Sequence, residues 1–128
     1  MNLAHLFRHE QPFVTVAAGD AVFRAGEEGA LMYVLMHGNA DIWVGDTIVE
    51  SAGPGALLGE MALIDEGKRS ATVLARTECQ LVPINIKRFH FLVEQTPHFA
   101  TYVMRIMADR LRRMDSKVLG IEKGENAD

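Results

Sequence analysis

One segment of the chain combines residue types that could bind a charged ligand. Residues 53–72 read GPGALLGEMALIDEGKRSAT, and the glycines in the first half allow a tight backbone path. The run from Glu60 to Ile64 could form a short helical turn whose free N–H groups favour an anion. Arg69 follows, and its planar guanidinium can pair with two phosphate oxygens. Since the carboxylate of Glu60 can only accept hydrogen bonds, it suits a sugar hydroxyl, and the segment indicates a sugar-phosphate ligand.

Glycines divide the region around this segment into runs of strand length. Nine of the eleven glycines lie between residues 19 and 67, and short runs rich in β-branched and aromatic residues separate them. Turn signals at this spacing are typical of an all-β sandwich or barrel. Strands are expected at residues 14–16, 21–24, 31–36, 42–44, 47–50, 70–75 and 79–84. Turns are expected at residues 37–40 and 44–47, where Gly45 can adopt the positive φ of a two-residue hairpin.

The hydrophobic pattern changes to helical spacing near the C-terminus. Residues 86–94 predict one helix, and Thr96-Pro97 is typical of the N-cap and first position of another. In that second helix, apolar residues recur at steps of three and four from Phe99 to Ile121. Its C-terminal end therefore resembles a heptad seam, which is expected to run past the strands and could pair with a second copy of the chain.

Composition predicts a single globular domain. The 128 residues are 48% hydrophobic and 23% charged, which is enough for one core. The expected order is a helical segment at residues 1–12, strands at 13–85, helices at 86–121 and a loose tail at 122–128. Gly120 is expected to end or fray the last helix.

Charge and residue counts disfavour several classes of protein. A net charge of −4 argues against a nucleic-acid partner, and no apolar run approaches the roughly 20 residues that span a bilayer. The N-terminus lacks the features of a signal peptide, so a cytoplasmic protein is expected. Cys79 is the only cysteine and is expected to be buried and inert. His5 and His9 have helical metal-pair spacing without a third ligand, so no metal site is expected.

The residues around Glu60 and Arg69 also form a motif of specific spacing. It reads Leu58-Gly59-Glu60-Met61-Ala62-Leu63-Ile64, a short loop, and then Arg69-Ser70-Ala71. This motif resembles the phosphate-binding cassette of cyclic nucleotide-binding domains, a family that includes the bacterial catabolite activator protein and the regulatory subunits of cyclic-AMP-dependent protein kinase. Residues 23–29 (FRAGEEG) resemble the early Gly-Glu turn of the family, and residues 32–44 (MYVLMHGNADIWV) its paired strands around a glycine.

The resemblance covers residues 13–119 and implies a fold. That fold is mainly β with flanking helices: an eight-stranded antiparallel β-roll, similar to a jelly roll, with a short phosphate-binding helix. The cassette would span residues 55–71, and the C-terminal helices would correspond to the B and C helices of the family. No helix-turn-helix segment follows them, so a standalone domain without a DNA-binding part is expected.

The resemblance also implies a role for each residue of the cassette. Glu60 would bind the ribose 2′-hydroxyl, Arg69 and the Ala62 N–H would bind the cyclic phosphate, and Ser70 would lie beside the phosphate or base. Other cassette residues expected to contact the ligand are Leu58, Gly59, Met61 and Ala71.

In the last helix, the base-facing positions depart from the family pattern. Met114 and Asp115 fall where the catabolite activator carries two small hydroxyl residues that read adenine. Met114 could cover the base as an apolar lid, and Asp115 could accept a hydrogen bond from an exocyclic amine. The choice between adenine and guanine therefore stays open. The nearby Arg110, Arg112 and Arg113 are expected on a solvated helix face.

The resemblance implies a sensor of cyclic AMP or cyclic GMP that has no catalytic residues and no cofactor. Binding would gather the cassette around the phosphate and shift the last helix over the base, and an unidentified effector protein would receive the signal. A jelly-roll metal enzyme or a cyclic phosphodiesterase would need several histidines, whereas His37 is the only one between residues 10 and 89. Two alternatives remain: a ligand-free interaction module, and the sensor half of a transcription regulator that lacks its DNA-binding domain.

Overall fold

The computed structural model describes residues 3–7, 9, 13–63 and 67–125, and in these residues ten strands form two four-stranded sheets and a two-stranded ribbon. The first sheet has the order β1 (Val14–Val16), β10 (Cys79–Ile84), β4 (Met32–His37) and β7 (Leu57–Leu58). The second has the order β2 (Ala21–Phe23), β9 (Thr72–Ala75), β5 (Ala40–Val44) and β6 (Thr47–Ala52). The ribbon pairs β3 (Glu28–Gly29) with β8 (Gly67–Lys68).

All of these pairings are antiparallel, so the predicted β-roll is confirmed. Strands β1 and β10 have the predicted bounds, and the other five predicted strands differ by one or two residues at their ends. The two main sheets contain the expected eight strands, and the ribbon is additional. Strands β3, β7 and β8 were not predicted, because each has only two residues and so shows no alternating pattern.

The two predicted turns have different roles in the fold. Val44 pairs with Thr47 across a two-residue hairpin, and Gly45 has a φ of +62°, as expected. The turn at Gly38 instead leads from β4 in one sheet to β5 in the other, so the interpretation of residues 32–44 as strands paired with each other is wrong. Gly38 has a φ of +94°, and a Cβ there would overlap with the Glu78 carbonyl oxygen. Only glycine therefore lets the chain cross between the sheets at this point.

The period of two along the strands divides the core into two hydrophobic clusters. Val34 and Val82 belong to a cluster that packs against the helices, whereas their neighbours Leu35 and Leu81 belong to a cluster with residues of both sheets. All four side chains are buried, because successive residues of a strand point to opposite faces and both faces are covered here. Cys79 is buried in the second cluster, as expected.

In the described part of the chain, four helical segments flank the sheets: α1 (Leu3–Leu6), the 3-10 turn η1 (Glu60–Leu63), α2 (Ile86–Gln95) and α3 (His98–Glu125). Within the helical segment expected at residues 1–12, the described helix spans only Leu3–Leu6. Helix α2 begins as predicted, with Asn85 Oδ1 accepting a hydrogen bond from the Arg88 N–H at 2.8 Å. Phe99 and Val103 of α3 are fully buried against the first cluster.

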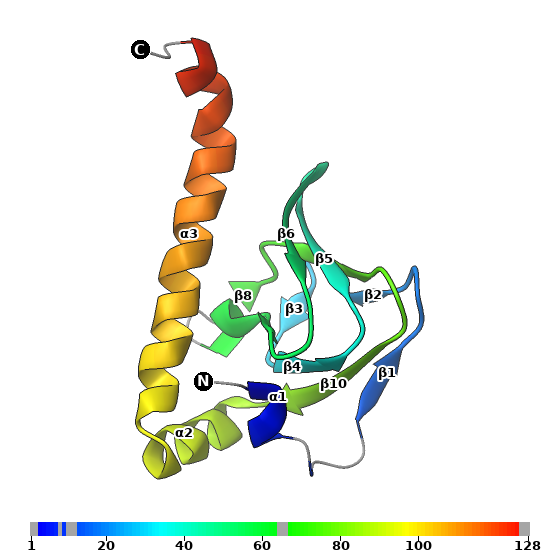
Figure 1. Cartoon of the computed structure of the whole chain (residues 1–128), viewed down its shortest axis with the longest axis vertical. Helices are drawn as coiled ribbons and strands as arrows, with labels where there is room; N and C mark the ends of the chain where they lie inside the picture. The colour runs from blue at the N-terminus through cyan, green and yellow to red at the C-terminus, as the bar shows by residue number, and fades with distance from the viewer. Residues whose placement is uncertain (1–2, 8, 10–12, 64–66, 126–128) are drawn as a thin grey trace.

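The last helix is longer than the sequence pattern indicated. It continues to Glu125, so the expected end near Gly120 and the tail from residue 122 are wrong. A glycine inside a helix costs only about 1 kcal/mol relative to alanine, which a long helix tolerates. Figure 1 shows the second half of α3 extending past the β-roll, as expected. None of the helices in the described ranges is long and apolar enough to cross a membrane.

Candidate functional site

A cavity of about 320 Å³ lies where η1, the start of β9 and the middle of α3 meet. Most of the cassette residues predicted from the sequence line it: Gly59, Glu60, Met61, Ala62, Arg69, Ser70 and Ala71. The other lining residues were not predicted: Phe23, Ile42, Lys68, Val73, Met107, Arg110 and Leu111. The lining is mainly apolar with a few charged groups, which is typical of small-molecule sites, and the volume suits a compact ligand.

The guanidinium of Arg69 is fixed in the wall of this cavity. Its Nη2 donates to the Leu31 carbonyl at 2.7 Å, and its Nη1 donates to the Gly59 carbonyl at 3.3 Å. The Nε is buried and has no hydrogen-bond partner among the described residues. A guanidinium has more N–H donors than these bonds use, so donors remain for a ligand.

The charge of Arg69 is only partly offset by the described residues around it. Within the described ranges, no carboxylate forms an ion pair with it. Burial lowers the pKa of Arg69, and electrostatic interactions with Tyr33, Glu27 and Glu60 offset this only in part. A partly buried cation without a counter-ion is stabilised by an anion that enters the cavity.

Two glycines make room for this side chain. A Cβ at Gly29 would overlap with Arg69 Nε, and a Cβ at Gly59 would lie 2.5 Å from Nη1. Gly59 also has a φ of +75°, which disfavours other residues. Gly59 was predicted as part of the site, and its role in the structure is to let the guanidinium approach. Gly29 was missed because β3 is distant in sequence and too short to show a pattern.

The second charged residue of the motif, Glu60, pairs with an arginine of α3. The side chain of Glu60 is only 5% exposed, and its Oε1 accepts a hydrogen bond from Arg110 Nη1 at 2.7 Å. Arg110 also donates to the two carboxylate oxygens of Glu50 at 2.9 and 3.1 Å, and to the Leu57 carbonyl. Burial alone would lower the pKa of Arg110, but the two glutamates outweigh it and the pKa is raised.

The expectation that Arg110 lies on a solvated face is therefore wrong. Its side chain is only 15% exposed, whereas that of Arg112 is 75% exposed and that of Arg113 is 55% exposed. A sequence signal existed, because Arg110 stands three residues after Met107, within the apolar stripe of the helix. A charged residue at such a position needs a buried partner.

Other predicted site residues have different positions. Leu58 is fully buried between the sheets and does not line the cavity. The Ala62 N–H, which was expected to meet a phosphate, donates to the Gly59 carbonyl at 3.2 Å. Met114 and Asp115 lie on α3 beyond Arg113, the last residue whose side chain is described. Among the α3 residues whose side chains are described, those at positions 107, 110 and 111 line the cavity.

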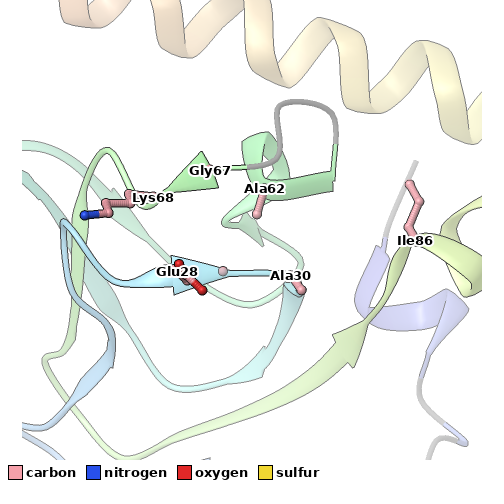
Figure 2. A pocket seen from close by; sticks show the side chains of 7 residues that line it. Glu28, Ala30, Ala62, Gly67, Lys68 and Ile86 are labelled. Atoms are coloured by element: carbon pink, nitrogen blue, oxygen red, sulfur yellow. The ribbon is translucent and has the colours of Figure 1, made fainter.

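A second, more open pocket of about 600 Å³ lies beside the cassette and shares some of its residues. Figure 2 shows it between the ribbon, which provides Glu28 and Lys68, and the start of α2, which provides Ile86. Ala62 and Lys68 line both pockets, but Glu60 and Arg69 line only the enclosed one. The enclosed cavity is therefore the candidate site.

Comparison with protein families and curated proteins identifies a family for this chain. A family model described as a cyclic nucleotide-binding domain matches residues 13–96. The potassium/sodium hyperpolarization-activated cyclic nucleotide-gated channel 3 of Mus musculus is 31% identical to this chain over 123 residues. That alignment covers 88% of the chain but only 16% of the channel, so the chain spans a small part of the relative it matches.

Solved structures of similar domains have the same fold. The structure described as cAMP-bound PfPKA-R (141–441) has a TM-score of 0.74 and 25% identity, and the match covers 82% of this chain and 36% of that one. The catabolite activator protein of Thermus thermophilus has a TM-score of 0.71 and 26% identity over 91% of this chain and 62% of that one. Together with the family model, these similarities show that the chain belongs to the cyclic nucleotide-binding domain family.

Proposed function

We propose that the chain binds cyclic AMP or cyclic GMP in the enclosed cavity and acts as a sensor rather than as an enzyme. The observation that carries this proposal is the state of Arg69, a cation in the cavity wall without a carboxylate partner in the described ranges. A cyclic phosphate has one negative charge and two free oxygens, which suit the remaining donors of a planar guanidinium.

The proposed contacts follow the cassette. Arg69 binds the cyclic phosphate, and Ser70 lies beside the phosphate or base. Glu60 uses one carboxylate oxygen for Arg110, which leaves the other to accept a hydrogen bond from the ribose 2′-hydroxyl. The Ala62 N–H reaches the phosphate by exchanging its 3.2 Å bond to the Gly59 carbonyl for a bond to a charged oxygen.

The base would occupy the apolar part of the cavity. Ile42 and Val73 of the second sheet and Met107 and Leu111 of α3 line that part. We propose Met114 as a lid over the base and Asp115 as the acceptor for an exocyclic amine, and the choice between adenine and guanine depends on such polar groups.

Coupling to the last helix is the second part of the proposal. Glu60 belongs to η1 and Arg110 to α3, so a ligand that moves the cassette acts directly on the helix. The ligand shifts α3 only to the extent that it prefers one helix position over another. The part of α3 beyond the β-roll would then transmit the change to an effector protein or to a second copy of the chain. We expect this to occur in the cytoplasm.

Isothermal titration calorimetry with cyclic AMP, cyclic GMP and linear 5′-AMP tests the proposal. We expect at least one cyclic nucleotide to bind and 5′-AMP to bind much more weakly, because its open, doubly charged phosphate does not fit the cassette. Arg69→Gln should reduce affinity by at least about 10- to 100-fold, since the loss of even one charge-assisted hydrogen bond costs about 1.5–3 kcal/mol. Glu60→Gln should cost less because its partner is a neutral hydroxyl.

Arg112→Gln is the matched control, since Arg112 is exposed and pairs only with Asp109 on its own helix among the described residues. Its affinity should equal that of the unmodified chain. If neither cyclic nucleotide binds, the sensor function is wrong and the interpretation as a ligand-free interaction module is favoured.

A further inference from the structure

The guanidinium of Arg69 lies on an aromatic ring. Its Cζ is 4.0 Å from the centroid of the Phe23 ring, well within the range of a cation–π contact. Phe23 is the last residue of β2, is only 8% exposed, and lines the same cavity as Arg69. The ring of Tyr33 is stacked with that of Phe23 at a centroid distance of 6.5 Å and an interplanar angle of 23°.

The Phe23 ring restrains a rotation of the Arg69 guanidinium that its hydrogen bonds leave free. The bonds to the Leu31 and Gly59 carbonyls hold the two terminal nitrogens, but two contacts allow the plane to rotate about the line between them. The Phe23 ring lies against Cζ, between these two nitrogens, and opposes such a rotation. An ordered guanidinium loses less side-chain entropy when a ligand binds.

The ring also stabilises the cation without using its donors. A carboxylate at this place would neutralise Arg69 and occupy the N–H groups that a phosphate needs. The face of a phenyl ring attracts a cation through its quadrupole and accepts no conventional hydrogen bond. Phe23 thus offsets part of the cost of burying Arg69, which no described carboxylate offsets by an ion pair.

We propose that Phe23 is a positioning residue for the ligand. Its ring sets the plane of the Arg69 guanidinium so that the unpaired donors meet the cyclic phosphate. This inference rests on the proposed function, because it assigns to Phe23 a share of the affinity for cyclic nucleotide. For the same reason we expect Arg69→Lys to bind the nucleotide more weakly, because an ammonium group has no plane that can stack on the ring.

Phe23→Leu tests the proposal, since leucine keeps an apolar side chain but has no π face. We expect affinity for the better-bound cyclic nucleotide to fall about tenfold. In the Arg69→Gln background, which has no cation to position, the same substitution should change affinity less than about twofold. This non-additivity separates action through Arg69 from direct contact with the ligand.

Phe7→Leu is a matched control. Phe7 is 1% exposed and also lies beneath an arginine, Arg88, at 5.5 Å, but it does not line the cavity. We expect it to lower the melting temperature without changing affinity. If Phe23→Leu does not fold, Phe23→Met replaces it, because an unbranched side chain adapts better to a tight core.

The outcomes separate the two proposals. If the unmodified chain binds a cyclic nucleotide and Phe23→Leu binds it equally well, the role of Phe23 is refuted while the sensor function stands. If Phe23→Leu lowers affinity by the same factor with Arg69 present and in the Arg69→Gln background, the positioning role of Phe23 is also refuted, because the ring then acts directly on the ligand or on the fold. If the unmodified chain binds neither nucleotide, both proposals fail.

Discussion

Substitution of Arg110 by methionine should strongly destabilise the protein. Arg110 connects three elements, because it bonds to Glu50 on β6, to Glu60 on η1 and to the carbonyl of Leu57 in β7. Methionine keeps much of the apolar stem and removes the charge and all of these donors. Both carboxylates then stay where the fold holds them, without the cation that offsets their charge.

The magnitude follows from the burial of each group. Removing one partner of a buried ion pair costs about 3–5 kcal/mol, because the other charge is left without compensation. Glu60 is 5% exposed and should incur this cost in full. Glu50 is 16% exposed and keeps Arg113 at 3.1 Å, so its additional cost is small. We therefore expect a loss of about 3 kcal/mol in the free energy of unfolding, which is a large share of the roughly 5–15 kcal/mol of a typical domain.

Denaturation by urea, followed by fluorescence of the single tryptophan, measures this loss. Trp43 lies on β5 with its indole nitrogen buried, so unfolding changes its environment. Two variants serve as controls. Arg112→Met removes an exposed pair and should cost less than about 1 kcal/mol. The triple variant that adds Glu50→Gln and Glu60→Gln to Arg110→Met should recover part of the loss, since no buried charge remains.

The reasoning is refuted if Arg110→Met is no less stable than Arg112→Met. That result would mean that water or a rearranged side chain compensates the two carboxylates as well as the guanidinium does. A triple variant as unstable as the single one would likewise show that lost packing, rather than unpaired charge, causes the destabilisation.

Three further predictions concern the site, the helix and the cysteine. Gly29→Ala places a Cβ where it overlaps with Arg69 Nε and should reduce both the melting temperature and the nucleotide affinity. Gly53→Ala, whose Cβ has only ordinary contacts, should leave calorimetric binding unchanged, and equal effects of the two substitutions would contradict the role given to the overlap with Arg69. A chain that ends at Leu111 should keep the circular dichroism of the β-roll and sediment as a monomer. It should also lose about 1.5–3 kcal/mol of binding free energy, because the apolar lid formed by Met114 is missing, and an unchanged affinity would exclude the lid. Burial raises the pKa of the Cys79 thiol, so alkylation at neutral pH should require unfolding, and labelling of the native protein would disprove this.

The features that the sequence predicts well depend on neighbouring residues. Strand positions follow from short β-branched runs between glycines, and the hairpin at Gly45 follows from a local backbone requirement. The cassette is recognisable because its residues lie within one short segment, and the structure shows Glu60 and Arg69 of this segment lining the same cavity. The start of α2 is similarly predictable, since hydrophobic periodicity and an N-cap are local signals.

Features that depend on residues distant in sequence were not predictable in this way. Leu58 belongs to the motif, but its strand directs it into the core between the sheets, away from the cavity. Strands β4 and β5, on either side of Gly38, pair with other strands and not with each other. The packing of whole sheets decides this, because a bend can have the same local sequence whether it closes a hairpin or crosses between layers.

The sequence by itself indicated an all-β sandwich or barrel and two charged residues that suit a sugar phosphate, because local periodicity and spacing encode them, and the resemblance of the motif implied the β-roll and the cassette. Only the tertiary structure decided which groups those charges meet. It places Arg110 between Glu50 and Glu60, which precede it by 60 and 50 residues, and it places Phe23 under Arg69. Whether an arginine is solvated, paired or stacked depends on the dielectric surroundings and partners that distant segments provide, and no pattern of neighbouring residues contains that information.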